Sequence, residues 1–392
     1  MTEIRLRILS SLSQISPSVW DACAAGEADR PEPFLTHAFL QALEDSGCAT
    51  ARTGWAARHL VLEGPDGSVW AVAPAYLKSH SRGEYVFDQG WAQAYEQAGG
   101  HYYPKLQVSV PFTPVTGRRL LVRPGVDVGV AQARLAAGLV ELARQSNASS
   151  VHVTFATQVE WAHLGQLGYL QRLDQQFQWT NLGYRTFEEF LDHLSSRKRK
   201  AIRRERRAAL ASGLEVQWLT GSDLTEAAWD AFFAFYLHTG ERKWGRPYLN
   251  RRFFSLLGER MADRVLLVMA VREGRYIAGA LNLIGAHTLY GRYWGALEEH
   301  PFLHFEICYH QAVDYAIAHH LAVVEAGAQG EHKLARGYLP VETHSAHFIA
   351  DPALRRAVAH YLDHERAQMT QIGAELAELG PYRRGEAPGE GD

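Results

Sequence analysis

One group of chemically useful side chains lies at the start of a predicted helix, after a short loop. His304, Phe305 and Glu306 open this helix, and Glu306, His310 and Asp314 follow one another at intervals of four residues. Side chains at that spacing share one face of an α-helix. We therefore expect Glu306 to face a cleft, where its carboxylate would accept the proton of an attacking amine. A structural alternative stays open, in which Glu306 only favours the positive end of the helix dipole.

A glycine-bearing turn follows the next predicted strand, within the segment Glu325–Gly337. Gly327 and Gly330 would let the backbone approach a ligand closely, and backbone N–H groups there could hold an oxyanion or a phosphate. Lys333 and Arg336 are three residues apart, so they share a helical face suited to an anionic ligand. The alternative is an ordinary strand-to-helix turn, because the pattern is neither a Walker loop nor a dinucleotide fingerprint.

Other residues complete the predicted site. Tyr293, which ends a strand, or Tyr309 would protonate the leaving group, while backbone N–H groups polarise the carbonyl. The residues predicted to bind a substrate or donor are His304, Arg292, Gln329, Gly330, His332, Lys333, Arg336, Lys105 and Tyr103. No histidine or cysteine spacing matches a zinc site, and no Gly-x-Ser-x-Gly elbow occurs, so we expect neither a metal nor a serine nucleophile.

The composition is that of an ordinary globular protein. Hydrophobic residues make up 47% and charged residues 21%, and the formal net charge of −3 gives no long-range attraction to nucleic acid or to an anionic membrane. The longest strongly apolar run, Val265–Val271, is too short to span a bilayer. The three cysteines show no disulfide framework. We expect a soluble, cytoplasmic protein with no tightly bound cofactor.

A basic run, Ser195–Arg207, holds eight basic residues and one acid. We expect it to form part of a helix at 195–210. The structural alternative is a solvated helix whose arginines pair with carboxylates elsewhere. The functional alternative is a site for the phosphates of coenzyme A or tRNA. The residues predicted for such a polyanion site are Arg197, Lys198, Arg203, Arg204 and Arg207.

The order of predicted elements repeats along the chain. The first half gives helix Phe34–Ser46, strands His59–Leu62, Val69–Leu77, Leu106–Val110 and Arg119–Val122, helix Val130–Gln145, strand Val151–Ala156, helix Gln158–Leu167 and strand Gln171–Thr180. The second half gives helices Ala227–His238 and Asn250–Met261, strands Val265–Val271, Tyr276–Ile284 and Leu289–Trp294, helix His304–His319, strand Val323–Ala326, a short helix and a last strand near His347–Ala350. Helices that cross between strands favour an α/β or α+β mixed sheet, and the repeat predicts two domains of one fold. We expect these domains at 1–182 and 183–384, with a disordered tail at 385–392.

Several motifs resemble those of the FemAB-like predicted N-acyltransferases, in order and over about Phe34 to Asp351. The motifs are Gly83–Asp88, Tyr102–Leu106, Pro111–Gly117, Ser196–Lys200, His304–Glu306 and Glu325–Gly337. The resemblance implies two tandem GNAT-type acyltransferase domains and transfer of an acyl group to an amine, as in the enzymes that add amino acids to peptidoglycan precursors. Neither half shows the Gln/Arg-x-x-Gly-x-Gly/Ala turn of acetyl-CoA-dependent members, so the donor stays open between acyl-CoA and aminoacyl-tRNA.

The sequence therefore predicts an N-acyltransferase that passes an acyl or aminoacyl group to an amine, possibly of a peptidoglycan precursor or another peptide. A second hypothesis from another class is a catalytically silent GNAT-like module that recognises a peptide or a polyanion. The two differ in whether Glu306, Tyr309, Gln329 and Lys333 converge on one open cleft.

Overall fold

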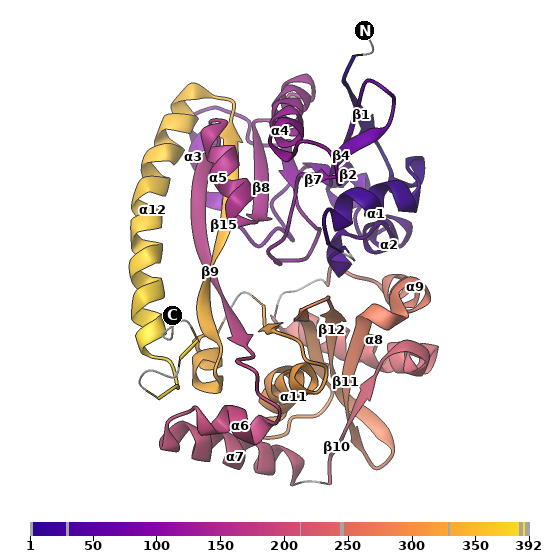
Figure 1. Ribbon diagram of the computed structural model, residues 1–392, viewed down its shortest axis with the longest axis vertical. Coiled ribbons are helices and arrows are strands. Elements are labelled where there is room, and N and C mark those ends of the chain that lie inside the picture. The colour runs from indigo at the N-terminus through magenta and orange to yellow at the C-terminus, as the bar shows by residue number, and fades with distance from the viewer. Residues whose placement is uncertain are drawn as a thin grey trace. The chain divides into compact units, whose positions relative to one another are not determined.

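The structure is a computed structural model (Figure 1) that describes residues 3–28, 31–211, 213–243, 247–327, 330–383 and 387–388. It divides into two compact units. Unit 1 comprises Met1–Asp174 and Glu342–Gln371, and unit 2 comprises Gln175–Val341 and Ile372–Asp392. The sequence placed one boundary at 182/183. The division instead falls inside two strands, β9 (Leu170–Thr180) and β15 (Leu339–Ile349), which carry no linker-like composition. Most of the predicted tail 385–392 lies outside the described residues.

Unit 1 contains two sheets. The strands β1 (Arg5–Leu9), β3 (His59–Glu63), β4 (Val69–Ala73) and β7 (Leu121–Val122) form an antiparallel sheet in that order. The second sheet has the order β2 (Trp55–Ala57), β5 (Ala75–Lys78), β6 (Lys105–Val108), β8 (Ser150–Ala156) and the end of β15. Within it β6 and β8 run parallel, and the other neighbours are antiparallel. The helices are α1 (Pro17–Ala25), α2 (His37–Asp45), α3 (Gln89–Gln97), α4 (Val128–Gln145), α5 (Gln158–Gln166) and α12 (Pro352–Glu378), which continues into unit 2.

Helix α4 connects the parallel strands of unit 1 and covers their core. Asp127 caps it by accepting the N–H of Val130 at 2.8 Å. Leu135 and Leu139 lie on its buried face, in one cluster with Val151 of β8. The spacing of these leucines is the 3.6-residue period that predicted the helix.

Unit 2 has the strand order β10 (Glu215–Leu219), β11 (Val265–Arg272), β12 (Arg275–Ile284), β13 (Thr288–Ala296), β14 (Val323–Glu325) and the end of β9. Strands β13 and β14 are parallel, and the other pairs are antiparallel. The helices are α6 (Phe187–Asp192), α7 (Ser196–Leu210), α8 (Glu226–Lys243), α9 (Arg251–Met261), α10 (Leu303–Phe305), the π-helical turn η6 (Glu306–His310), α11 (Gln311–Ala318) and the 3₁₀ segment η7 (Glu331–Arg336).

Both faces of the unit 2 sheet are covered. Ala278 and Ala280 of β12 belong to the core cluster that contains Ile307 and Ala312. Gly279 lies between them, and a Cβ there would meet Phe232 of α8. Because alternate residues of a strand point to opposite faces, η6 and α11 cover one face and α8 the other. Gly295 of β13 is required, since a Cβ would lie 2.0 Å from the carbonyl oxygen of Phe235.

The predicted mixed α/β architecture is confirmed, but several elements differ. The predicted strand Val69–Leu77 divides at Pro74, which has no N–H to donate. The predicted helix Phe34–Ser46 is interrupted at Thr36, whose hydroxyl caps α2 through the N–H of Phe39. The predicted helix His304–His319 contains the π-helical turn η6. The sequence analysis missed β1, β10, α1, α3 and α12.

Candidate active site in unit 2

Strand β13 extends well beyond its parallel neighbour. In the described part of the chain, β13 pairs with β14 only at Thr288, Leu289 and Tyr290. Residues Gly291–Ala296 continue with β12 on their other side. Among the described residues, the pairing with β14 therefore ends six residues before β13 does.

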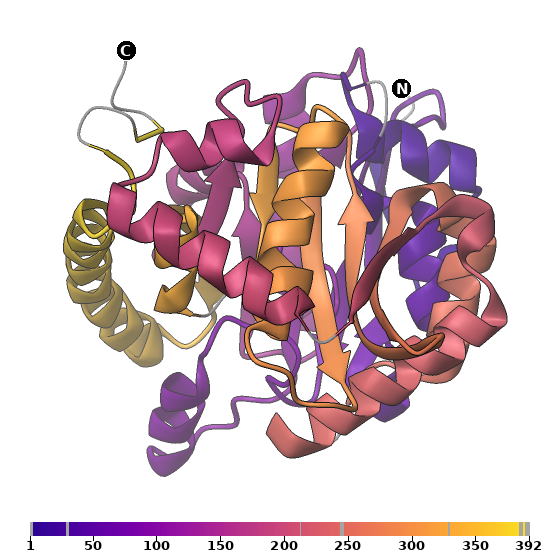
Figure 2. The same ribbon diagram turned by 90° about the horizontal axis from the view of Figure 1, so that it is seen from below.

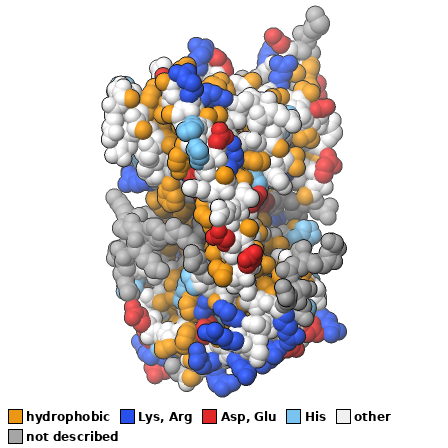
Figure 3. Space-filling model, turned by 90° about the vertical axis from the view of Figure 1, so that its left-hand side faces the viewer, with side chains coloured by type: hydrophobic (Ala, Val, Ile, Leu, Met, Phe, Trp, Pro, Cys, Tyr) orange, Lys and Arg blue, Asp and Glu red, His pale blue; other side chains and the backbone are white. Residues whose placement is uncertain are grey.

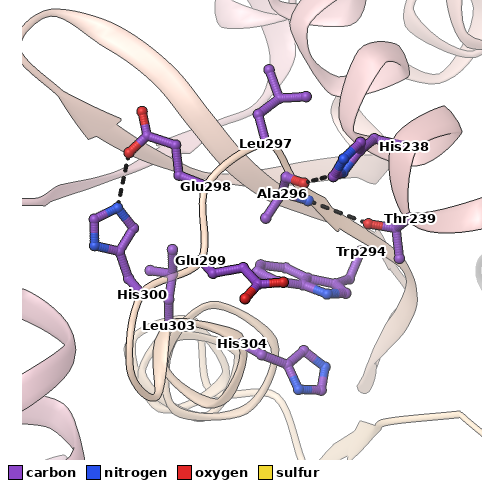
Figure 4. A pocket seen from close by; sticks show the side chains of 10 residues that line it. All are labelled: His238, Thr239, Trp294, Ala296, Leu297, Glu298, Glu299, His300, Leu303 and His304. Carbon is purple, nitrogen blue, oxygen red and sulfur yellow. Dashed lines mark hydrogen bonds and ion pairs between the residues drawn. The ribbon is translucent and has the colours of Figure 1, made fainter. Parts of the chain in front are cut away.

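A cavity of about 560 Å³ lies at the carboxyl end of β13 (Figure 4). Two residues of α8 form part of its wall and bind the strand: His238 Nδ1 donates to the carbonyl of Ala296 at 2.8 Å, and Thr239 Oγ1 accepts the Ala296 N–H at 3.4 Å. Glu298 pairs with Arg272 at 3.0 Å and accepts His300 Nε2 at 2.9 Å. The lining residues are His238, Thr239, Trp294, Ala296, Leu297, Glu298, Glu299, His300, Leu303 and His304. Among these, histidine is the only type that can carry a positive charge.

His304 connects the cavity with aromatic side chains of the next turns. Its ring lies 5.0 Å from Trp294 and 5.4 Å from Tyr309, centroid to centroid. Tyr309 is buried and shares a hydrogen bond of 3.0 Å with Nε2 of the exposed His332. Burial raises the pKa of Tyr309 well above its ordinary value, so its hydroxyl remains protonated at neutral pH.

Lys333 is buried on η7, after the turn that follows β14. Its Nζ donates to the carbonyl of Gly327 at 2.7 Å and lies 5.7 Å from the ring centroid of Phe177. Burial lowers the pKa of the Lys333 amine to about 7; the Cys308 thiol acts to raise it and Arg292 to lower it. An amine with this pKa is half neutral near pH 7. The sequence predicted Lys333 as an anion-binding cation, but its environment also suits proton transfer.

Gly330 precedes η7, and Arg336 is its last residue. The guanidinium of Arg336 lies 3.4 Å from the ring centroid of Phe305, pairs with Glu205 at 2.7 Å and donates to the carbonyl of His332. Gly330 has a φ of 116°, a conformation that favours glycine. Gln329, predicted to belong to this turn, lies outside the described residues.

Glu306, the predicted base, is fully buried in an ion pair. Its carboxylate accepts Arg206 Nε at 3.1 Å, Arg206 Nη2 at 2.9 Å and Gln311 Nε2 at 2.8 Å. A carboxylate held in this way has little freedom to receive a substrate proton. The base role of Glu306 remains a prediction, and this ion pair argues against it. His310 and Asp314, expected on the same cleft-facing side, contact α7 instead, through Glu205 and Arg206.

Arg292 and Tyr293 lie on the extension of β13. The Arg292 guanidinium is 5.6 Å from the Tyr293 ring centroid, and that ring contacts Tyr236 of α8 at 5.3 Å. Both side chains are half-buried. The structure therefore brings Arg292 near Lys333, whose pKa it lowers, whereas Tyr293 packs against α8. His304 of α10 lines the cavity, and Tyr309 of η6 contacts the His304 ring.

The basic helix α7 is drawn beside α6 in Figure 2. Its charged side chains divide between two sides of the helix. Arg206 and Glu205 face η6 and η7 within unit 2. Arg199 pairs with Asp192 at 3.0 Å, and Arg203 pairs with Glu188 of α6. The outer stripe, which we define as Arg197, Lys200, Arg203, Arg204 and Arg207, is exposed. Of the stripe, only Arg203 makes an ion pair with a described residue. Lys198, predicted for this site, is half-buried and sits about 100° around the helix from Arg197.

Lys105 and Tyr103, also predicted to bind a substrate, belong to unit 1. Lys105 is fully buried and donates to Ser81 at 2.8 Å, Glu84 at 2.6 Å and Asp88 at 2.5 Å. Tyr103 is half-buried and shares a hydrogen bond of 2.8 Å with Ser81. This network fills the space around the amine, so the geometry favours a structural role for Lys105.

Several residues of the unit 2 site had no signal in the sequence. His238 and Thr239 end a helical pattern that is ordinary in composition, and Glu298 and His300 lie in a loop. No group of three or more histidine, cysteine or acidic residues in the described part of the chain is arranged to hold a metal ion. No described helix is both long enough and apolar enough to cross a membrane.

Comparisons with known proteins place this site in a family. Residues 11–384 match the FemAB-like family, described as peptidoglycan biosynthesis/recognition. A crystal structure of FemX is similar with a TM-score of 0.55 and 14% identity, over 88% of this chain and 98% of that chain. The structure of L-PGS from Bacillus licheniformis gives a TM-score of 0.50 and 9% identity, over 83% and 96%. At these identities the likeness concerns the fold alone.

A tandem GNAT protein from the clavulanic acid biosynthesis pathway gives a TM-score of 0.47 and 14% identity, over 89% of this chain and 99% of that chain. A search of curated proteins finds no sequence that matches. The family model nevertheless extends over the predicted motifs of both units, from Gly83–Asp88 to Glu325–Gly337. The chain therefore belongs to the FemAB-like family, as its motifs predicted.

Proposed function

We propose that this enzyme transfers an aminoacyl group from aminoacyl-tRNA to an amine of a peptidoglycan precursor, at the site in unit 2. One arrangement carries the proposal. Strand β13 extends beyond β14, a cavity lies at the carboxyl end of β13, and the buried Lys333 lies in the segment that follows β14. Membership of a family described by peptidoglycan biosynthesis supports the class of acceptor.

In the reaction the acceptor nitrogen attacks the ester carbonyl of the donor. An N–C bond forms, the C–O bond to the ribose breaks, the amine loses a proton and the leaving hydroxyl gains one. Lys333 is our candidate for the base, because burial lowers its pKa to about 7 and leaves much of the amine neutral at physiological pH. Tyr309 is our candidate for the proton donor, because its raised pKa keeps the hydroxyl protonated.

The charges of unit 2 favour aminoacyl-tRNA over acyl-CoA. The cavity lining contains Glu298 and Glu299 and neither lysine nor arginine, which is unsuited to the phosphates of coenzyme A. The outer stripe of α7 has five cations within the eleven residues Arg197–Arg207, a length of about 15 Å. In Figure 3 blue side chains gather at the lower end of the molecule, where Figure 1 has α7. A row of this length suits a chain of phosphates better than a single diphosphate.

The test is a transfer assay with the purified full chain. Charged tRNA and a panel of acyl-CoA thioesters serve as donors, and a lysine-containing peptidoglycan pentapeptide serves as acceptor. We expect mass spectrometry to detect one added aminoacyl residue on the peptide with charged tRNA, and at least about 10²-fold slower addition when Lys333→Met replaces the native enzyme. Transfer from acyl-CoA alone would show that the donor assignment is wrong. Absence of transfer from every donor would contradict the proposed reaction.

A further inference from the structure

The helix that follows β13 is interrupted by a π-helical turn at its functional end. In η6 the N–H of Gln311 bonds to the carbonyl of Glu306, five residues earlier, whereas α-helical bonding resumes in α11. A turn of this kind holds one residue more than an α-helical turn, and it is rare. Something in the surrounding structure must favour it over the α-helical alternative.

The contacts of Arg206 provide a physical reason for the π register. Its Nη2 donates both to Glu306 at 2.9 Å and to Asp314 at 2.6 Å. In a continuous α-helix these acids, eight residues apart, would point about 80° away from each other. The extra residue of the π turn removes about 100° of rotation, so they point within about 20° of the same direction. One guanidinium then reaches both carboxylates.

We call Arg206, Glu306 and Asp314 the clamp. Its members make further contacts with neighbouring side chains. Glu306 is fully buried, and its second partner, Gln311, is itself held by the indole N–H of Trp218 at 2.8 Å. The guanidinium carbon of Arg206 lies 4.3 Å from the ring centroid of Phe187. Buried ion pairs add little net stability, but they can select one register over another. The clamp therefore has more effect on geometry than on stability.

The register decides which side chains reach the site. Leu303 and His304 line the cavity from α10, just before the turn, and Tyr309 bonds to His332 from within it. Without the extra residue, α10 would rotate by about 100° relative to α11. Leu303 and His304 would then leave the cavity wall.

The geometry points to Arg206 as a positioning residue: by binding Glu306 and Asp314 together it holds η6 in the π register, and thereby holds His304 and Tyr309 at the site. This inference rests on the proposed transfer reaction for its functional part. Its structural part, the register of residues 306–311, is independent of any substrate.

The test neutralises the clamp without leaving unpaired buried charges. We compare the native enzyme with the triple variant Arg206→Met, Glu306→Gln and Asp314→Asn. The matched control on the same helix is Arg199→Met with Asp192→Asn, an ion pair that does not touch η6. A crystal structure reports the register, amide hydrogen exchange reports the N–H of Gln311, and steady-state kinetics separate kcat from KM.

We expect the triple variant to fold and to show α-helical bonding at 306–311, with kcat lowered at least tenfold and KM changed less than twofold. The control should retain the π register and native kcat. A π register that persists in the triple variant would overturn the inference. If the triple variant does not fold, Arg206→Lys is the second variant, because lysine keeps the charge and lacks the guanidinium that reaches both carboxylates. We expect amide hydrogen exchange at Gln311 to become about tenfold faster in this variant. An unchanged exchange rate would overturn the inference. A native enzyme that transfers nothing would contradict the proposed function while leaving the register result valid.

Discussion

Lys105 in unit 1 and Lys333 in unit 2 are both buried lysines beside a parallel pair of strands, yet their surroundings differ. Burial alone acts to lower the pKa of Lys105, but the carboxylates of Glu84 and Asp88 outweigh it, and the pKa is raised. Lys333 donates to a carbonyl, and burial lowers its pKa to about 7. One lysine is therefore fixed as a cation within the fold, and the other can exchange a proton near neutral pH.

The two parallel strand pairs, β6 with β8 in unit 1 and β13 with β14 in unit 2, also differ in what lies beyond the ends of their strands. Beyond β6 the chain segment 111–115 is buried in unit 1, Gly117 donates to the carbonyl of Phe155, and Arg119 donates to that of Thr154 at 2.9 Å. Unit 1 thus fills the end of its strand pair with its own chain. In unit 2, β13 extends beyond its pairing with β14 and a cavity lies at its carboxyl end. The same arrangement of strand, helix and strand is filled by the chain in unit 1 and borders a cavity in unit 2.

The largest effect on stability should come from removing the positive charge of Lys105. Lys105→Met leaves the buried Asp88 without its lysine and Glu84 with Lys78 at 3.6 Å, and we expect a loss of about 3–5 kcal/mol in the free energy of unfolding. Urea denaturation at pH 7 measures it. Burial and Asp88 raise the pKa of Glu84 while the lysines lower it, with a net increase. The loss should therefore shrink as the pH falls and the carboxylates take up protons. Lys333→Met is the matched variant, for which we expect under about 1 kcal/mol. Equal losses would remove the distinction between the two lysines.

The second prediction concerns the pH dependence of the rate. If the neutral Lys333 amine is the base, kcat rises with pH through about 7 and then levels off. Lys333→Met should lower the rate at pH 8 by at least about 10²-fold and abolish that inflection. Initial rates between pH 5.5 and 9 at saturating donor provide the check. An inflection that survives in the variant belongs to another group.

The third prediction concerns the exposed arginines of α7 and the binding of tRNA. The variant Arg203→Ala, Arg204→Ala and Arg207→Ala should weaken binding of tRNA, because these cations belong to the outer stripe. Each lost phosphate contact should change the slope of log K against log salt by about 0.7–0.9, so the slope becomes less negative by about 2–3. The control replaces three exposed arginines of unit 2 outside α7: Arg185, Arg252 and Arg275. Equal changes in both variants would mean that only total charge matters.

The smallest effect is expected for Tyr309→Phe. It removes a hydroxyl that shares a hydrogen bond with His332 and leaves the ring packed against Tyr338. We expect kcat to fall about tenfold, because water or His332 can still protonate the leaving group. Tyr315→Phe on α11 is the control, with native kcat expected. An unchanged rate in Tyr309→Phe would remove this residue from the mechanism.

The class of fold, the family and much of the helix and strand content follow from local patterns in the sequence. Regular spacing is a local property, so α4, β11 and β12 follow from the periodicity of their apolar residues. Short strands such as β10 and a helix among aromatic residues such as α3 were missed, because few residues carry their signal. Dense motifs in the right order identified the family before any geometry was known.

The surroundings of the charged residues depend on contacts that form only when the chain has folded. Glu306 has the sequence environment of a base, but Arg206, one hundred residues earlier, occupies its carboxylate. Lys105 and Lys333 both lie in family motifs, and their opposite pKa shifts depend on whether carboxylates from distant segments surround the amine. The eight basic residues of the α7 run look alike in sequence, yet packing against η6 and α6 separates the inner clamp from the outer stripe. Desolvation and long-range pairing act across the fold, so no local pattern contains them.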